Sequence, residues 1–264
     1  MGDERARSLA ALGMIVGARC SLPACEGTLP PLRGQMEVGR DAYAVFVAGK
    51  GVAGGDLYAV RTEGGVAVPL TFTNVGEMRP ALSPDGGAVA FLRGQSLRDS
   101  TPGTVWVMNL LSGADRELAL PKGAGLPTRV GWSRDGRSIV VGTATALYRF
   151  GALPGPPDPH LVPPAERAAA ESSLAVLLGE PAFTRVVPCR EPDALCVLGD
   201  TGSPGLLAQR ARDAARWGAD SVAYIAGNAV EVRPLGPGRA RTLQVSGAPG
   251  PLRQVTVFTG RPAP

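Results

Sequence analysis

The sequence predicts an all-β domain built from a repeated antiparallel unit, and three observations support this prediction. The 264 residues include 36 Gly and 25 Pro, the two residues that most oppose regular helix. Hydrophobic residues make up 44% of the chain and charged residues 19%, which is the balance of a globular protein with a sizeable core. Strand–turn–strand segments also recur along the chain. We therefore expect one large β domain rather than a helical bundle.

The clearest repeat is a hairpin that occurs twice. Residues 77–94 align with residues 127–144, so that the sequence SPDG at 83–86 falls on SRDG at 133–136. Ser and Asp side chains can bond the turn backbone, Pro presets φ, and Gly accepts a positive φ. Alternating apolar residues flank both turns. Each segment is therefore predicted to be strand, tight turn, strand.

Weaker copies of the hairpin occur at residues 185–198 and 214–226, and an edge copy occurs at 38–47. Third strands are predicted behind the hairpins at residues 54–62, 103–111, 144–151 and 227–235. Outer strands are predicted at residues 67–73 and 239–246. Four antiparallel strands in each unit of about 40–50 residues is typical of a β-propeller blade. The prediction is a single β-propeller of five four-stranded blades.

Three segments complete the expected architecture. Residues 151–164 form a Pro-rich loop, and residues 165–179 have the Ala, Glu and Leu content of a helix, so a helical insertion is expected between the third and fourth blades. Residues 205–217 fit either a helix or strands, and a degenerate blade there would bring the total to six. The last strand, at 254–259, is expected to pair with residues 32–38 and close the ring.

The repeat resembles a known family at this level of detail. An SPDG turn, the strand AVAF, a strand such as VWVM and an outer strand ending in LTFT resemble the PD40 repeat of TolB-like propellers, within the WD40-like superfamily. The resemblance is close over residues 38–151 and loose over residues 182–260. It implies a β-propeller fold. It implies no single function, because the repeat occurs in periplasmic adaptors, peptidase propeller domains and other envelope proteins.

The N-terminal segment, residues 1–30, is expected to lie outside the propeller of residues 31–264. Residues 8–18 form an 11-residue apolar stretch, which fits a secretory signal or an interfacial anchor but is too short to span a bilayer. Cys25 follows Leu22, Pro23 and Ala24, a sequence similar to a lipoprotein box, and is a candidate lipidation site. A short buried or amphipathic N-terminal segment is the alternative. The predicted location is periplasmic or otherwise extracytoplasmic, in association with a membrane.

The four cysteines fall in two close pairs without the spacing of a zinc or redox motif. Cys189 and Cys196 flank a turn signal, so they can face each other across a hairpin and form a disulfide in an oxidising compartment. Two buried free thiols are the alternative.

No catalytic, cofactor-binding or metal-binding residue is predicted. The one histidine, His160, lies in the Pro-rich loop and is expected to be exposed, and no nucleophile elbow, zinc helix, phosphate loop or dinucleotide motif occurs. The Asp residues of the SPDG-type turns are expected to be structural. The inner strands RPALS, RVGWS and RVVPC read as apolar or small, which argues against a site in the central channel.

Trp106, Trp132 and Trp217 are expected to fill the wedges between blades, with ligand stacking as the alternative. The formal net charge of +4 is scattered, so no nucleic-acid partner is expected. Arginine does suit protein interfaces, although an ordinary solvated surface is the alternative. The candidate interaction surface comprises Arg93, Arg98, Arg116, Arg129, Arg134 and Arg137.

The sequence therefore predicts a non-catalytic scaffold at the extracytoplasmic face of a membrane, without a cofactor. Its partner is expected to be a membrane-protein complex of the envelope, respiratory or photosynthetic type, of which this chain would be an extrinsic subunit. The alternative functions are binding of a small ligand or sugar in the central channel, and a propeller-based hydrolase or lyase.

Overall fold

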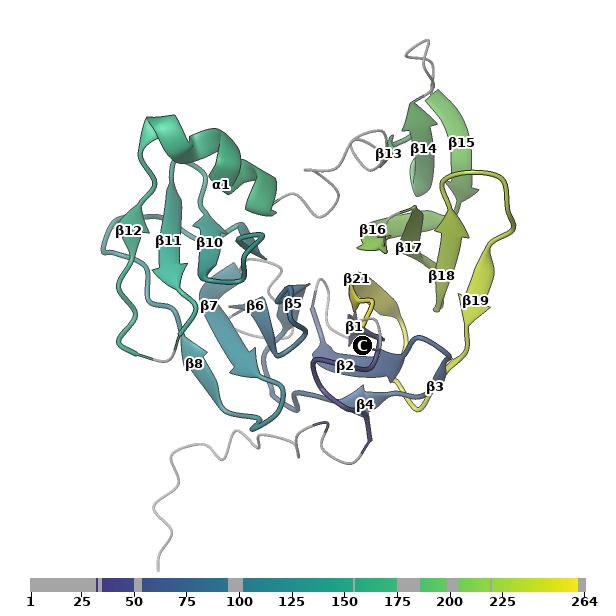
Figure 1. Cartoon of the computed structure of the whole chain (residues 1–264), viewed down its shortest axis with the longest axis horizontal. Coiled ribbons are helices and arrows are strands. Elements are labelled where there is room, and N and C mark those ends of the chain that lie inside the picture. Colours follow the sequence, from purple (N-terminus) through teal and green to yellow (C-terminus); the bar gives the residue numbers. More distant parts are fainter. Residues whose placement is uncertain are drawn as a thin grey trace, which may run out of the picture.

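The computed structural model describes residues 32, 35–49, 54–94, 102–153, 155–174, 186–198, 204–218 and 220–260. These residues form five antiparallel sheets arranged as blades around a common centre, as Figure 1 shows. The sheets follow one another along the chain, except that the last strand joins the first sheet. The predicted β-propeller is therefore confirmed, with five blades in the described residues.

The blades are numbered in chain order, and their strands run from the centre to the rim. Blade 1 contains β21 (Leu252–Phe258), β1 (Tyr43–Ala48), β2 (Asp56–Arg61) and β4 (Val68–Pro69). Blade 2 contains β5 (Glu77–Leu82), β6 (Ala88–Gly94), β7 (Pro102–Asn109) and β8 (Asp115–Glu117). Blade 3 contains β9 (Arg129–Trp132), β10 (Ser138–Gly142), β11 (Leu147–Gly151) and β12 (His160–Leu161). Blade 4 contains β13 (Val186–Pro188), β14 (Ala194–Leu198) and β15 (Pro204–Gln209), and blade 5 contains β16 (Ala211–Trp217), β17 (Ser221–Ala226), β18 (Ala229–Pro234) and β19 (Arg241–Leu243).

The two SPDG-type turns adopt the predicted structure. Ser83 Oγ donates a hydrogen bond to Asp85 Oδ1 at 2.5 Å and accepts one from the Ala88 N–H at 2.9 Å, while Gly86 takes a φ of 68°. The second turn repeats these contacts, since Ser133 Oγ donates to Asp135 Oδ1 at 2.6 Å. That bond holds the pKa of Asp135 below its ordinary value. Both Asp side chains therefore belong to the turns.

The last strand pairs differently from the prediction. β21 pairs with β1, from Tyr43 opposite Phe258 to Ala48 opposite Leu252, and not with residue 32 or the described residues 35–38. The described residues from 35 to 42 instead form turns, in which Met36 N–H bonds Leu32 O at 3.1 Å. The expected hairpin at residues 38–47 therefore contributes only one strand, β1. Its inner neighbour is β21, which comes from the C-terminal end of the chain. A second link is the parallel pair of β3 (Gly65–Val66) and β20 (Val245–Ser246).

Residues 204–217 are strands, and the helical alternative for residues 205–217 is wrong. β15 pairs with β14, and β16 pairs with β17 in the next blade. Arg210, with a φ of 52°, lies between the two strands. Sheet pairing thus overrides the helix propensity of the Ala- and Arg-rich sequence. The segment belongs to blades 4 and 5, and the described residues show no sixth blade.

The predicted helical insertion is present between blades 3 and 4. A 3₁₀ turn, η1 (Pro164–Glu166), leads into α1 (Arg167–Leu174), and residues 175–179 of the predicted helix lie outside the described residues. The end of α1 packs directly on Gly131 in β9, where an added Cβ would lie 2.0 Å from Ser173 O. None of the helices in the described residues has the length and apolar composition needed to cross a bilayer.

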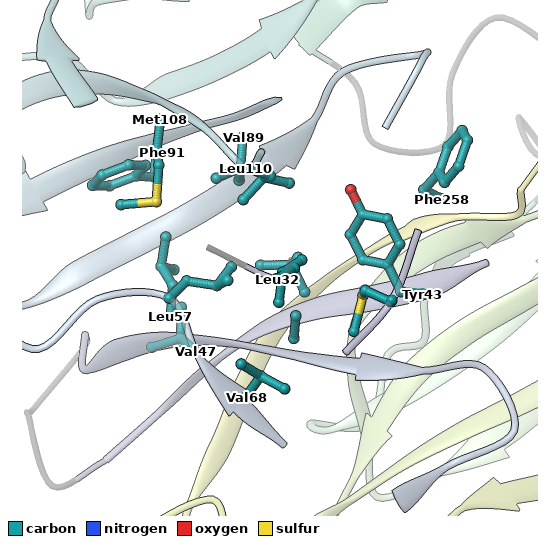
Figure 2. Close-up of a cluster of buried hydrophobic side chains, with 14 residues drawn as sticks. Leu32, Tyr43, Val47, Leu57, Val68, Val89, Phe91, Met108, Leu110 and Phe258 are labelled. Atoms are coloured by element: carbon teal, nitrogen blue, oxygen red, sulfur yellow. The ribbon is translucent and has the colours of Figure 1, made fainter. Parts of the chain in front are cut away.

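The core consists of apolar clusters between neighbouring blades. Side chains alternate along β1, so that Val45 and Val47 pack toward blade 2 while Ala44 and Phe46 pack toward blade 5. Figure 2 shows the cluster between blades 1 and 2, in which Tyr43 packs near Phe258 with ring centroids 5.7 Å apart. Similar clusters join blades 2 and 3 and blades 4 and 5. On the free side of blade 3, α1 supplies the packing surface instead of another blade.

The three tryptophans are half-buried at these blade interfaces, as the packing prediction requires. Trp106 packs against the cluster between blades 1 and 2, Trp217 against that between blades 1 and 5, and Trp132 against that between blades 2 and 3. Trp132 has a second environment, because it also lines the cavity described below.

Candidate binding site in the central channel

A cavity of about 690 Å³ lies where the inner strands of four blades converge. Its walls come from β5 of blade 2, β9 of blade 3, β16 of blade 5 and β21 of blade 1, with Ser173 and Leu174 at the end of α1. The volume lies within the range of about 300–1,000 Å³ that is typical of small-molecule sites. The central channel is therefore the candidate binding site.

Three of these inner strands carry the same irregularity at the cavity wall. Their pairing registers shift at a β-bulge that contains Arg79 in β5, Asp213 in β16 and Gln254 in β21. The three residues take φ values of 54°, 52° and 52°, in the left-handed region that non-glycine residues seldom occupy. A bulge redirects a side chain relative to the regular strand. Polar side chains consequently line a wall that regular alternation would have left apolar.

The bulge residues are linked to one another across blade boundaries. Asp213 Oδ2 accepts a hydrogen bond from the Gln254 N–H at 3.0 Å, and Gln254 Oε1 accepts one from the Arg79 N–H at 2.5 Å. Arg79 Nη1 in turn donates to the carbonyl oxygen of Thr128, just before β9. The chain of bonds runs from blade 5 through blades 1 and 2 to blade 3, and we call it the bulge relay. It holds the polar lining in one arrangement.

Two further bonds connect the inner strands. The Leu82 N–H of β5 donates to Thr256 Oγ1 of β21 at 3.3 Å, and the indole Nε1–H of Trp132 donates to the carbonyl oxygen of Ala81 at 2.9 Å. The ring of Trp132 is therefore fixed at the cavity wall by its own hydrogen bond and by the packing of blades 2 and 3.

The cavity lining is rich in arginine. Arg79, Arg129, Arg134 and Arg216 line it, and Asp213 is the one carboxylate among the described residues of the lining. Arg129 forms a two-pronged ion pair with Glu171 of α1, with N–O distances of 2.8 and 3.3 Å. Among the described residues, the site therefore brings together four arginines, Asp213 and Glu171.

The described members of the predicted arginine surface do not lie together. Arg93 is buried, with 6% of its side chain exposed, and pairs with Glu77 at 3.2 Å and Asp115 at 3.5 Å while its guanidinium lies 4.1 Å from the Trp106 ring centroid. Including Arg93 was wrong, because the buried Glu77 and the half-buried Asp115 draw its guanidinium inward.

The four other described arginines of this set lie at three different places. Arg129 and Arg134 line the cavity, while Arg98 lies outside the described residues. Arg116 bonds the carbonyl oxygens of Gly151 and Leu153 at the rim, and Arg137 has an 87% exposed side chain at the second hairpin turn.

The polar lining from Arg79, Asp213, Gln254 and Arg216 was not predicted from the sequence. The inner strands read as apolar or small around each of these polar residues. A signal was present, because strict alternation of polar and apolar residues is interrupted in three inner strands. The interruptions are at Arg79-Pro80-Ala81, Asp213-Ala214-Ala215 and Gln254-Val255-Thr256. Without the pairing register, that signal does not distinguish a bulge from a loop.

The remaining predicted residues lie away from the channel lining or outside the described residues. Cys189 and Cys196 are joined by a disulfide across the hairpin of β13 and β14, with their Cα atoms 5.2 Å apart, beside a second hollow of about 500 Å³ between blades 4 and 5. Cys25 lies outside the described residues. His160 belongs to the short rim strand β12 rather than to a loop, and its exposed Nε2 lies 3.2 Å from Asp158 Oδ2. The described residues contain no cluster of three or more potential metal ligands.

Five antiparallel blades, with the last strand paired into the first blade, define a β-propeller fold around a central cavity with polar lining. No family model matches the chain, and no curated protein matches it. Among solved structures, a chain in the crystal structure of a nidogen–laminin complex matches with a TM-score of 0.56 and 11% identity, over 83% of this chain and 100% of that chain. This match supports the propeller fold and nothing further.

Two TolB structures also match this chain. TolB from Acinetobacter baumannii has a TM-score of 0.38 and 13% identity, over 77% of this chain and 53% of that chain. A putative TolB from Agrobacterium tumefaciens has a TM-score of 0.34 and 18% identity, over 77% of this chain and 61% of that chain. The chain thus covers between half and two thirds of each TolB chain.

Proposed function

We propose that this protein is a non-catalytic binding protein that holds its ligand or a partner segment in the central channel. The observation that carries this proposal is the cavity of about 690 Å³ whose polar wall is held by the bulge relay. Such a wall is ordered before any ligand arrives, which lowers the entropic cost of binding. The proposal favours the channel over the outer surface that the sequence suggested.

The chemistry of the lining supports binding over catalysis. The described lining contains two serine hydroxyls, and both are engaged within the protein. Ser133 Oγ bonds Asp135 and Ser138 in its turn, and Ser173 Oγ donates to the carbonyl oxygen of Ala169 at 3.3 Å. A nucleophile needs an adjacent base. The histidine of this chain lies at the rim of blade 3, with its side chain 71% exposed.

The proposed location is an extracytoplasmic compartment at a membrane surface. The disulfide between Cys189 and Cys196 supports an oxidising compartment, since such bonds are rare in the cytosol. The apolar residues 8–18 supply a segment that can serve as a signal or an interfacial anchor. In this proposal the propeller is an extrinsic subunit of a membrane-protein complex, and the channel receives the ligand or the partner segment.

Site-specific photo-crosslinking tests the proposal. A photoreactive amino acid replaces Arg216, which lines the cavity, in the full chain expressed in its native host, and the matched control replaces Arg239, an exposed arginine on the loop before β19. We expect an adduct at position 216, seen as a shift in mass or gel mobility, and none at 239. Equal labelling at both positions, or none at 216, would overturn the channel as the binding site.

A further inference from the structure

We propose that a second copy of this chain pairs with β15 and supplies the fourth strand that blade 4 lacks in the described residues. The observation that carries this inference is a difference among the blades. Blades 1, 2, 3 and 5 each contain four strands, whereas the sheet of blade 4 ends at its third strand, β15 (Figure 1). This edge is separate from the central channel, so the inference goes beyond the proposed function.

The chain leaves no room for a fourth strand after β15. In the other blades, the fourth strand is formed by the residues between the third strand and the inner strand that follows. β15 ends at Gln209 and β16 of blade 5 begins at Ala211, so Arg210 is the whole connection. In the part of the chain that the structure describes, β14 is the one strand that pairs with β15.

The strands that end the other four sheets are protected against pairing with another chain. Each is two or three residues long and contains a proline, an imidazole or a charge: Pro69 in β4, Asp115, Arg116 and Glu117 in β8, His160 in β12, and Arg241 in β19. Short length, proline and charge are devices that keep sheet edges apart.

β15 has few of these devices. It is six residues long, has the sequence PGLLAQ and carries no charged side chain. Its proline is the first residue, so the residues that follow keep their backbone N–H groups for pairing. In an antiparallel ladder about half of these groups point away from the paired strand, toward the open edge. Leu206 is 56% exposed on this strand, so the edge also offers an apolar side chain.

Two features of this edge fit a second copy of the chain. Two copies of one strand that are related by a two-fold axis pair antiparallel, and the fourth strand is antiparallel to the third in each of the other blades. Self-pairing also brings like side chains close together, so that a charged edge would repel itself. The uncharged sequence of β15 avoids this repulsion, and the pairing covers Leu206 with apolar residues of the other copy.

The extent of the edge sets the strength of the dimer. β15 is short, and its pairing with β14 contains a register shift that interrupts a regular ladder. Such an edge buries less surface than the roughly 1,200–2,000 Å² of a standard stable interface. The dimer should therefore dissociate on dilution, with a Kd of about 1–100 µM.

Sedimentation velocity on the purified full chain tests this inference at concentrations from about 1 to 300 µM. We expect the wild type to change from monomer to dimer across this range. Leu206→Lys should raise the Kd about tenfold or more, because it places like charges near each other across the two-fold axis. Leu161→Lys is the matched control, since it makes the same change at a 64% exposed leucine on the outer strand β12, and it should leave the Kd unchanged.

Two results of this experiment would overturn the inference. One is a wild type that stays monomeric at about 300 µM, well above the expected Kd. The other is a dimer that both variants weaken equally or that neither variant weakens, because such a dimer would use another surface.

Hydrogen exchange identifies the strand that pairs. Amides of residues 205–209 should exchange more slowly in the dimeric wild type than in the diluted monomer, because pairing engages N–H groups that otherwise face water. Leu206→Lys should show no such difference at the same two concentrations. Slower exchange at other strands, with none at β15, would place the interface elsewhere and overturn the inference.

Discussion

Asp213 Oδ2 accepts a hydrogen bond from the backbone N–H of Gln254 at 3.0 Å, across 41 residues of sequence and from one blade to the next. Both residues sit at β-bulges and both have a positive φ. The side chain of one bulge residue, Asp213, thus accepts a hydrogen bond from the backbone N–H of another, Gln254, which the bulge in β21 leaves out of the pairing between strands. This contact is the first step of the bulge relay that shapes the channel.

The first prediction tests that contact. Asp213→Ala should lower the free energy of unfolding by about 1–2 kcal/mol, because it leaves the Gln254 N–H without its acceptor and places alanine at a positive φ. Asp213→Asn is the control, since asparagine tolerates this conformation and keeps an acceptor oxygen. Urea unfolding of the purified chain measures both. Equal stability of the alanine variant and the wild type would contradict the relay.

The second prediction concerns the pH dependence of stability. Glu77 is fully buried between blades 1 and 2, and burial raises its pKa from 4.5 to about 7 against the opposing attraction of Arg93 and the hydrogen bonds from Thr71 and Thr73. Between these two pH values the native state binds more protons than the unfolded state. The contribution of Glu77 to stability is therefore complete below about pH 4.5 and is lost as the pH rises through about 7.

Glu77→Gln separates this effect from other titrations. The variant cannot titrate at this position, so the difference in unfolding free energy between wild type and variant should shrink or reverse as the pH rises from about 4.5 to about 7. Chemical denaturation across that range measures the difference. A difference that stays constant with pH, or grows, would show that Glu77 does not titrate as the structure indicates.

The third prediction tests how the helical insertion is seated. Gly131→Ala places a methyl group where the structure leaves 2.0 Å to Ser173 O, so α1 must move away from β9. We expect a loss of about 1–3 kcal/mol in stability and faster hydrogen exchange in residues 167–174. Gly151→Ala, in the same blade but with nothing within 4 Å of the added Cβ, is the control. Unchanged exchange in α1 would rule out the close approach.

The fourth prediction tests the closure of the ring. Phe258 of β21 is buried against Tyr43, and its ring also lies against Gly86, where an added Cβ would come within 2.6 Å of it. Phe258→Ala should lower the free energy of unfolding by about 3–5 kcal/mol. Phe72→Ala, which truncates a phenylalanine that is 70% exposed, should change it by less than about 0.5 kcal/mol. Similar effects of the two truncations, in thermal or urea unfolding, would contradict closure through β21.

The sequence by itself determined the features that depend on neighbouring residues. The SPDG-type turns are local, since Ser83, Asp85 and Gly86 bond or bend within one turn, and the alternation of apolar residues follows from the period of two in a strand. These local features predicted the repeated hairpins, the five blades and the insertion before blade 4. The pairing of Cys189 with Cys196 was open in the sequence as one of two alternatives, and a hairpin with six residues between these cysteines brings them together.

Only the tertiary structure decided the features that depend on contacts between distant segments. Whether β21 pairs with residues 32–38 or with β1 is a question of long-range register, as is the choice between helix and strand at residues 205–217. The bulges at Arg79, Asp213 and Gln254 exist relative to a partner strand, so no single segment reveals them. Likewise Arg93 is drawn inside by Glu77 and Asp115. Arg129 and Arg134, by contrast, line the channel because they lie on and just after β9, the inner strand of blade 3. The physical reason is that turn chemistry acts over a few residues, while burial, charge pairing and register are set by residues that only the folded chain brings together.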